Sequence, residues 1–519
     1  MELEKLNWDP KYLFPALVAI ALAVFVLERH GRSRSSVPAV KKKRKYHVVA
    51  GTVLHQLCNF HRLHDYMTGL AGKHKTYRLL SLFRNEVYTT DPINIEYFLK
   101  TNFGNYGKGE YQHTILKDLL GDGIFTVDGE KWKVQRKVAS YQFSTRLLKD
   151  FSSSVFKSNA VKLAGMVSKA SMSNQIIEIQ DLFFKSTLDS VFKIILGVDL
   201  DTMGGTYEDG TKFSSAFDDA SGITLLRYVD IFWKIKRFLH IGPEASLGKN
   251  IKEVDDFVYK VIKSKTDQRI QKSTTISSMS EPERKDLLSR FLELEETDPK
   301  YLKDIILSFI IAGKDTTATT LSWFLYILCK HHDVQEKIVE EVEEATKKMA
   351  GFSNVEELAG SITEEALENM PYLTAALTET LRIYPAVPWD AKVCFSDDTW
   401  PDGFSVKKGD LVSYLPYAMG RMKFLWGDDA EEFKPERWLD TNGKFQPESP
   451  FKFTAFQAGP RLCLGRDFSY RQMKTFSAIL LSSHKFKLAD QNKTANYKTN
   501  LTLHMDGGLH LYAYPRLGH

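Results

Sequence analysis

The chain has 519 residues, of which 43% are hydrophobic and 26% charged, and its formal net charge is +5 at pH 7. This composition is typical of a globular protein, and the charge is too mildly basic to indicate a nucleic-acid-binding protein. The 4 cysteines lie far apart and form no CxxC pair. Zinc and iron–sulfur ligation and a disulfide framework are therefore disfavoured.

The N-terminal region predicts a membrane anchor. Residues 12–27 are an uncharged apolar run, and a basic cluster follows that includes KKKRK at 41–45. A cleaved signal peptide or a buried core helix is the alternative, but no small-residue cleavage site follows the run. The division expected is an anchor at 1–30, a basic linker at 31–47 and a catalytic domain at 48–519. The positive-inside rule then places the catalytic domain on the cytosolic side.

The first elements after the linker are a hairpin and a helix. Residues 77–83 and 86–90 alternate in polarity around a short polar turn, which predicts two paired strands. Asp91 and Pro92 then provide an N-cap and a first-turn proline for a helix that ends near Lys100.

Trp132 and Arg136 are spaced i, i+4, so they share one face of a predicted helix. Both side chains donate hydrogen bonds and suit an acidic group. The alternative is a core tryptophan beside a surface arginine. Lys131, Lys133 and Lys137 add positive charge to the same segment.

Two polar stretches in the middle of the chain, 202–212 and 273–285, are predicted to be exposed loops. Between them, residues 232–241 read FWKIKRFLHI, with aromatic and basic side chains together. We expect an amphipathic helix whose apolar side packs in the core. A surface that dips into the membrane interface is the alternative.

A long apolar helix is predicted from Pro299 to about His331. It contains AGKDTT at 312–317, where a glycine and hydroxyl side chains reduce helix propensity. Such a cluster indicates a functional site within the helix. The alternative is that the Thr316 hydroxyl only donates back to a preceding carbonyl.

Farther along, Glu379 and Arg382 form an ExxR pair on one helix face, where a salt bridge can form. On its own this spacing is weak evidence, because such pairs are common on helices. Arg437 follows within the segment PERW.

The strongest motif is FQAGPRLCLG, which extends from Phe456 to Gly465. Its glycines, Gly459 and Gly465, permit a tight turn whose backbone N–H groups point at the Cys463 sulfur and tune a bound metal. Arg461 supplies a permanent charge for an acidic cofactor edge, such as a haem propionate. The alternative is that Cys463 is only a small buried hydrophobe.

Taken together and in this order, the four motifs resemble those of the cytochrome P450 superfamily. The resemblance implies a mainly α fold with a minor β subdomain, preceded by a single transmembrane anchor in the endoplasmic reticulum membrane. It also implies haem b, with the Cys463 thiolate as the proximal iron ligand that favours O–O cleavage. Electrons are expected from an NADPH–cytochrome P450 reductase, which docks on a basic face that adds Arg466 and Arg471 to the lysines around Trp132.

The resemblance also assigns roles to the other motifs. A local opening of the long helix is expected to form an oxygen pocket in which Thr316 hydrogen-bonds dioxygen and Asp315 supplies protons, with Lys314 turned away. Glu379, Arg382 and Arg437 are expected to form a buried ionic lock. The residues expected to contact haem are Cys463, Trp132, Arg136, Arg461, Phe456, Gly459, Gly465, Ala312 and Gly313.

Ala312 further predicts noncovalent haem. In animal fatty-acid ω-hydroxylases of this superfamily, a glutamate at the matching position can attach to haem covalently.

The substrate is indicated less directly. Segments 121–140, 384–390 and 501–509 look like those of the plant long-chain fatty-acid ω-hydroxylases, so we expect oxidation of the terminal carbon of a fatty acid. The alternatives are a monooxygenase of a terpenoid or alkane, a reductase-independent hydroperoxide isomerase or dehydratase, and a haem sensor. The predicted substrate-lining residues are mostly apolar: Ile124, Phe125, Phe309, Val387, Pro388, Trp389 and Leu501.

Overall fold

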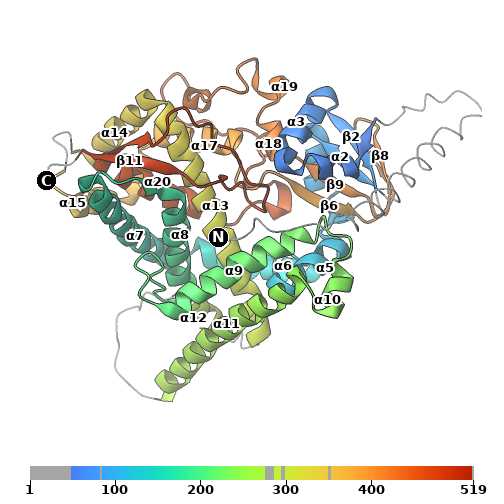
Figure 1. Ribbon diagram of the computed structural model, residues 1–519, viewed down its shortest axis with the longest axis horizontal. Coiled ribbons are helices and arrows are strands. Elements are labelled where there is room, and N and C mark those ends of the chain that lie inside the picture. The colour runs from blue at the N-terminus through green and yellow to red at the C-terminus, as the bar shows by residue number, and fades with distance from the viewer. Residues whose placement is uncertain (1–47, 82–84, 275–285, 294–297, 349–351, 517–519) are drawn as a thin grey trace, which may run out of the picture.

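The structure is a mainly helical fold with its larger β-sheet at one end (Figure 1). The predicted anchor and basic linker lie outside the described part of the chain. Among the helices that are described, none is both long and apolar enough to cross a membrane. This computed structural model describes residues 48–81, 85–274, 286–293, 298–348 and 352–516.

A long buried helix, α13 (Pro299–Lys330), runs through the middle of the molecule (Figure 1). The Asp298 carboxylate accepts a hydrogen bond from a first-turn N–H at 3.1 Å and caps the helix. The predicted helix and its proline start are therefore confirmed. α13 packs closely against α8 (Ile179–Leu196), because a Cβ at Gly313 would lie 2.7 Å from Val191 Cγ2.

The other helices form two groups around α13 (Figure 1). α9 begins within the segment predicted to be a loop, because Glu208 and Asp209 supply acidic charge to its first turn. One group comprises α7 (Arg146–Met172), α14 (His332–Thr346), α15 (Val355–Ser361), α16 (Glu364–Glu368), α17 (Pro371–Ile383) and α20 (Arg466–Ser483). The other comprises α5 (Gly109–Leu120), α6 (Gly129–Ser144), α9 (Glu208–Leu226), α10 (Trp233–Leu239), α11 (Pro243–Thr274) and α12 (Leu287–Glu293).

The main sheet has strand order β1-β2-β3-β9-β6-β4. β2 and β3 pair antiparallel with Thr76 opposite Thr89, so the predicted hairpin is confirmed. A three-stranded sheet, β10-β11-β5, and a two-stranded one, β7-β8, complete the β structure. The strands are β1 (Val49–Thr52), β2 (Thr76–Leu80), β3 (Glu86–Thr89), β4 (Tyr106–Gly107), β5 (Ile177–Glu178), β6 (Asp390–Cys394), β7 (Asp398–Thr399), β8 (Ser405–Val406), β9 (Leu411–Tyr414), β10 (His484–Leu488) and β11 (His510–Pro515).

The helix predicted after the hairpin changes its winding halfway along. Asp91 caps α4 (Pro92–Glu96), as predicted, and a π-helical turn, η2 (Tyr97–Thr101), follows. Such turns are frequent at functional sites. Here the turn brings the Leu99 carbonyl against Gly459, where a Cβ would lie 2.1 Å from the carbonyl oxygen. The sheet end of the molecule also carries α2 (Val53–Cys58), η1 (Phe60–Arg62), α3 (Leu63–Lys73) and η3 (Phe103–Asn105).

The expectation that residues 232–241 pack their apolar side in the core is wrong. The segment does form a helix, α10, but among its large apolar side chains only Trp233 is buried. Phe238 is 81% exposed and Ile235 57% exposed, and Phe232 just before the helix is also exposed. The cause is the position of α10 at the edge of the fold, beside α5 and α11, where no element of the described chain covers these side chains (Figure 1).

Candidate active site

The loop before α20 is shaped by its glycines. Gly459 has a φ of +66° and stands so close to the Leu99 carbonyl that no larger residue fits. It opens a 3₁₀ turn, η5 (Gly459–Arg461). The Cys463 N–H then donates to the Phe456 carbonyl at 2.9 Å and closes the loop. Three residues after the cysteine, α20 begins at Arg466 with its positive N-terminal end toward the loop.

The Cys463 thiol is enclosed by protein and yet accessible. Burial raises its pKa, while the Gly465 N–H and the charges of Arg136 and Arg466 lower it. The residue nevertheless exposes a large fraction of its surface. The thiol therefore has many protein atoms around it, although solvent still reaches the residue.

A second accessible face lies on α13. Throughout the stretch from Leu302 to Cys329, all residues are buried except Ala312, Gly313 and Thr316. α13 also packs against α20, which starts directly after the cysteine loop.

Two arginines join α6 to the cysteine loop. Arg136 donates to the Leu462 carbonyl next to Cys463. Arg461 pairs with Asp128 at 2.6 Å and stacks on Trp132, with 4.4 Å from its guanidinium carbon to the ring centroid. The Nε of Arg461 is buried and has no protein partner. A buried cation with a free donor suits an anionic cofactor edge, as predicted for a propionate.

The sequence interpretation missed a lysine beside this edge. Lys392 of β6 is 1% exposed and pairs with Asp390 at 2.6 Å, while Lys108 reaches the same carboxylate at 3.2 Å. Burial together with the charges of Lys108 and Arg461 lowers the pKa of Lys392 to about 7, and Asp390 opposes this. Three cations therefore face two carboxylates, Asp390 and Asp128. Lys392 lies two residues after Asp390 on one strand face, which was the only sequence signal.

The excess of positive charge is the chemical test for haem in this chain. Haem carries two propionates on one edge and needs cations there, and it needs one axial ligand with open space around it. The cluster of Lys392, Lys108 and Arg461 meets the first need, and Cys463 meets the second. The residues present therefore fit the group.

In this structure the Thr316 hydroxyl donates to the Ala312 carbonyl at 2.6 Å, which is the back-bonded alternative that the sequence left open. The expected local opening is not present, since α13 continues unbroken from Pro299 to Lys330. The reason is that this hydroxyl bond accompanies the helix ladder rather than replacing it. Gly313 is used for contact with α8, as its closeness to Val191 shows.

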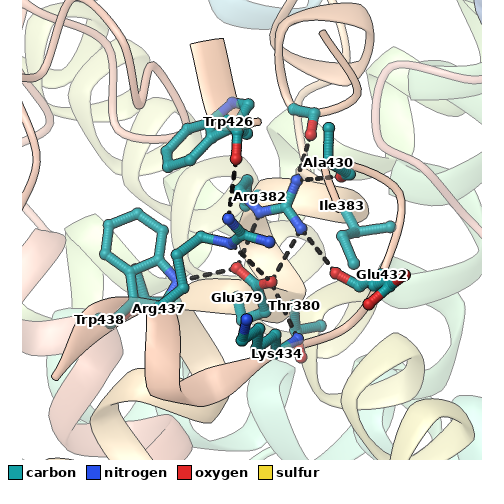
Figure 2. Close-up of polar contacts among 12 residues, drawn as sticks. Glu379, Thr380, Arg382, Ile383, Trp426, Ala430, Glu432, Lys434, Arg437 and Trp438 are labelled. Carbon is teal, nitrogen blue, oxygen red and sulfur yellow. Dashed lines mark hydrogen bonds and ion pairs between the residues drawn. The ribbon is translucent and has the colours of Figure 1, made fainter. Parts of the chain in front are cut away.

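The ExxR pair lies at the centre of a buried polar network (Figure 2). Glu379 and Arg382 of α17 are joined by two bonds of 2.7 and 2.8 Å, and both side chains are fully buried. Arg437 Nε lies 3.4 Å from the same carboxylate, and Trp438 Nε1 donates to it at 2.8 Å. The structure thus brings the three predicted residues of the lock together and adds Trp438.

The remaining donors of the network fix the chain that precedes the cysteine loop. Arg382 donates to the carbonyls of Gly420, Ala430 and Glu432, and Arg437 donates to that of Trp426 (Figure 2). These carbonyls follow one another along the chain, so the lock holds this whole segment against α17. Its short helices are α18 (Pro416–Met419), α19 (Lys423–Trp426) and η4 (Pro435–Trp438).

The predicted substrate-lining residues do not all meet. Ile124 and Phe125 pack with Trp132 and Leu464, beside Cys463. Phe309 is buried on α13. The other predicted residues lie in two segments, 387–389 and the one around Leu501. A hydrogen bond of 3.0 Å from the Leu503 N–H to the Ala386 carbonyl joins these two segments.

Trp389 lies apart from these residues. It packs against Tyr88 under the main sheet, with 5.9 Å between ring centroids, and Leu501 is exposed. Val387 is half-buried and Pro388 is buried.

A cysteine in a glycine-shaped loop, basic side chains beside it and a buried helix with an acid–alcohol pair are features of the class of haem-thiolate oxidoreductases. Comparison with known proteins agrees. The family model of cytochrome P450 matches residues 45–511. Cytochrome P450 704C1 of Pinus taeda is 50% identical over 92% of this chain and 94% of its own, and Cytochrome P450 704B1 of Arabidopsis thaliana is 43% identical over 93% and 95%. Cytochrome P450 94B3 of Arabidopsis thaliana is 38% identical over 92% and 93%.

The chain belongs to the cytochrome P450 family. It is therefore a monooxygenase of the kind that uses haem-thiolate iron and takes electrons from NADPH through a reductase.

Proposed function

We propose that the protein hydroxylates a long-chain fatty acid at its terminal carbon, with Cys463 as the thiolate ligand of noncovalently bound haem. The observation that carries the ligand assignment is the accessible thiol enclosed within the fold. When bound, haem supplies the oxygen activation. Ala312 offers no carboxylate for a covalent attachment.

The chain's own groups prepare this site. The Gly465 N–H and Arg136 lower the pKa of Cys463 against the effect of burial, which favours the thiolate. Arg461, Arg136, Trp132 and the newly found Lys392 hold the propionates. On the other side, Thr316 hydrogen-bonds dioxygen and Asp315 supplies protons.

Two observations support the preference for a fatty acid: the similarity of particular sequence segments, and the apolar side chains next to the cysteine loop. The segments at 121–140 and 501–509 look like those of plant fatty-acid ω-hydroxylases. Ile124 and Phe125 place apolar surface next to the cysteine loop. Attack on a terminal carbon requires the chain end to be held near the oxidant while weaker internal C–H bonds are kept away.

The test is product analysis with the full chain, NADPH and reductase. Lauric to stearic acids should give ω-hydroxy acids as the main products. In a mixture with an alkane and a terpenoid, the fatty acid should be oxidised in preference to both. Preferred oxidation of the terpenoid or alkane would contradict the substrate assignment. Consumption of a fatty-acid hydroperoxide without NADPH would instead support the isomerase alternative.

Docking of the reductase is proposed on the basic face around α6 and the start of α20. Lys131 and Lys133 are more than half exposed, and Arg466 is nearly so. Each also has a nearby carboxylate, so the face carries charges of both signs. Complementary charge on the reductase speeds its encounter with this face.

We further propose that residues 1–30 anchor the protein in the endoplasmic reticulum membrane and that α10 makes a second membrane contact. α10 exposes apolar side chains together with Lys234, Lys236 and Arg237. Apolar and basic groups on one short helix suit the interface of an anionic bilayer.

The α10 contact predicts a graded loss of membrane binding. A protein that lacks residues 1–45 should still bind vesicles of phosphatidylcholine and phosphatidylserine in cosedimentation. Changing Phe232, Ile235 and Phe238 to Ser should weaken this binding more than tenfold, because each large apolar side chain contributes ~1 kcal/mol or more at an interface. A matched control is Met172→Ser with Ile176→Ser, which removes exposed apolar groups from another face. Equal loss in the control would contradict the assignment.

A further inference from the structure

Residues 97–109, which extend from η2 to the start of α5, adjoin the cysteine loop at two points. At the first point the Leu99 carbonyl lies directly against Gly459 and leaves no room there for a Cβ. At the second, two backbone N–H groups where α5 begins donate to the Asp128 carboxylate at 2.9 and 2.8 Å. Asp128 in turn pairs with Arg461 of the loop. The conformation of this segment therefore affects the conformation of the loop.

One carboxylate, that of Asp398 on β7, binds the middle of this segment. Its Oδ2 accepts from the Tyr106 hydroxyl at 2.7 Å and from the Asn102 side-chain amide at 2.8 Å. Its Oδ1 accepts from the Tyr97 hydroxyl at 3.1 Å. Tyr97 is the first residue of η2, and Asn102 follows its last residue. Asp398 thus joins both ends of the π-helical turn, although it lies far away in the chain.

The winding of η2 sets the direction of the Leu99 carbonyl. The Asn102 N–H donates to the Tyr97 carbonyl at 2.7 Å, which is the bond over five residues that defines a π-helical turn. The Asn102 side-chain amide also donates to the Tyr97 hydroxyl at 3.2 Å. A π-helical turn holds one residue more than an α-helical turn, so its carbonyls point differently. Loss of this winding would therefore move the Leu99 carbonyl relative to Gly459.

The bonds to Asp398 are those of a charged acceptor. Burial raises the pKa of Asp398, but the hydrogen bonds that it accepts, that from Tyr106 above all, outweigh burial and lower the pKa below its usual value. The carboxylate is therefore ionised near neutral pH. Hydrogen bonds to an ionised acceptor are stronger than those to a neutral one.

An aromatic contact supports the same junction. Phe98 of η2 is fully buried, and its ring stacks on that of Trp400 with 5.4 Å between the centroids. Trp400 Nε1 also donates to the Tyr106 hydroxyl at 3.0 Å. This packing does not need the charge of Asp398. A substitution of Asp398 by asparagine should therefore weaken the hydrogen bonds to η2 and leave the aromatic contact in place.

We propose that Asp398 is a positioning residue that holds both ends of η2, so that the Leu99 carbonyl stays against Gly459 and the cysteine loop stays closed. The Cys463 N–H closes that loop on the Phe456 carbonyl at 2.9 Å, and Gly459 lies between these two residues in the chain. A shift at Gly459 therefore acts on the closing bond. The consequence for catalysis rests on the proposed role of Cys463 as the ligand of the haem iron.

Asp398→Asn should open the cysteine loop locally. The asparagine lacks the charge and turns an NH2 group toward donors, so the bonds to Tyr106 and Asn102 weaken. In the haem-loaded full chain, amide hydrogen exchange of residues 456–463 should become faster by about tenfold or more, because a bond to a charged group typically contributes that much to an equilibrium. The measurement is mass spectrometry of resolved peptides. Exchange in α17 should stay unchanged, since the buried lock holds that helix.

A second readout is the spectrum of the reduced protein with carbon monoxide. At equal haem content, a smaller fraction of the Soret band should lie at the thiolate position in Asp398→Asn than in the unchanged protein. Tyr97→Phe removes one donor and keeps the carboxylate, so it should change the exchange and the band in the same direction by a smaller factor.

Asp397→Asn is the matched control. Asp397 pairs with Lys407 at 2.7 Å, with both side chains 61% exposed, and it accepts from the Lys408 N–H at 2.9 Å. It therefore ties the β7-β8 hairpin together through partners on the hairpin rather than on η2. The control loosens the hairpin and should leave both the exchange of residues 456–463 and the Soret band unchanged.

The outcomes separate this inference from the proposed function. Unchanged exchange of residues 456–463 in Asp398→Asn, or an equal rise in Asp397→Asn, would overturn the role of Asp398. If Asp398→Asn exchanged rapidly throughout the chain, Tyr97→Phe would decide, and unchanged loop exchange in that variant would also overturn it. A thiolate band that persisted in Cys463→Ala would refute the ligand assignment alone, because the exchange rates report on the loop whichever residue binds iron.

Discussion

Cys463→Ala should remove the Soret band that reduced protein with carbon monoxide shows when its haem is ligated by a thiolate. The physical reason is that the sulfur is the one group in the loop able to bind iron strongly, while the Gly465 N–H and Arg136 only modulate it. We expect complete loss of the band and of monooxygenase activity. The measurement is the carbon monoxide difference spectrum of reduced protein at equal protein concentration.

Cys58→Ala is the matched control, because Cys58 is also an exposed cysteine but belongs to α2 near the main sheet. It should keep the full band. A spectrum typical of histidine-ligated haem in the unchanged protein would refute the assignment of Cys463. So would an unaltered band in Cys463→Ala.

Local signals in the sequence predicted local structure well. The Asp298 cap with its following proline defines the start of α13, and the alternation before Thr89 defines the hairpin. The cysteine loop was recognisable for the same reason, because its glycines permit a tight turn that is specified within a few residues. A further demand is not local, because the carbonyl of the distant Leu99 lies against Gly459 and leaves no room for a larger residue.

Features that depend on distant partners were missed or wrong. The pattern of α10 revealed an apolar face but not that this face stays uncovered. The role of Lys392 could not be predicted, because only the folded chain places it near Lys108 and Arg461. The pairing of Lys314 with Asp218 likewise joins two helices that are separated in the chain. Periodicity and spacing describe one element at a time, so contacts of this kind lie beyond them.

Removing the central carboxylate of the buried lock should be the most destabilising single change outside the cysteine loop. Glu379→Gln leaves Arg382 fully buried without a counter-charge and turns amide N–H groups toward guanidinium donors. Breaking a buried pair by removing one partner typically costs about 3–5 kcal/mol. We expect a loss of this size in the free energy of unfolding, measured by urea denaturation followed by circular dichroism, with loss of haem at lower urea concentration.

Glu436→Gln gives the matched comparison one residue before Arg437. Glu436 pairs with Lys337 at 3.1 Å, but the two side chains are 47% and 48% exposed. Water replaces that partner readily, so the change should cost ~1 kcal/mol or less. An equal cost for the two substitutions would show that the lock is not held by charge. The expected difference follows from the donors that Glu379 accepts from, which are Arg382, Arg437, Trp438 and the Lys434 N–H (Figure 2). Arg382 and Trp438 are fully buried, so water does not replace the carboxylate for these two donors.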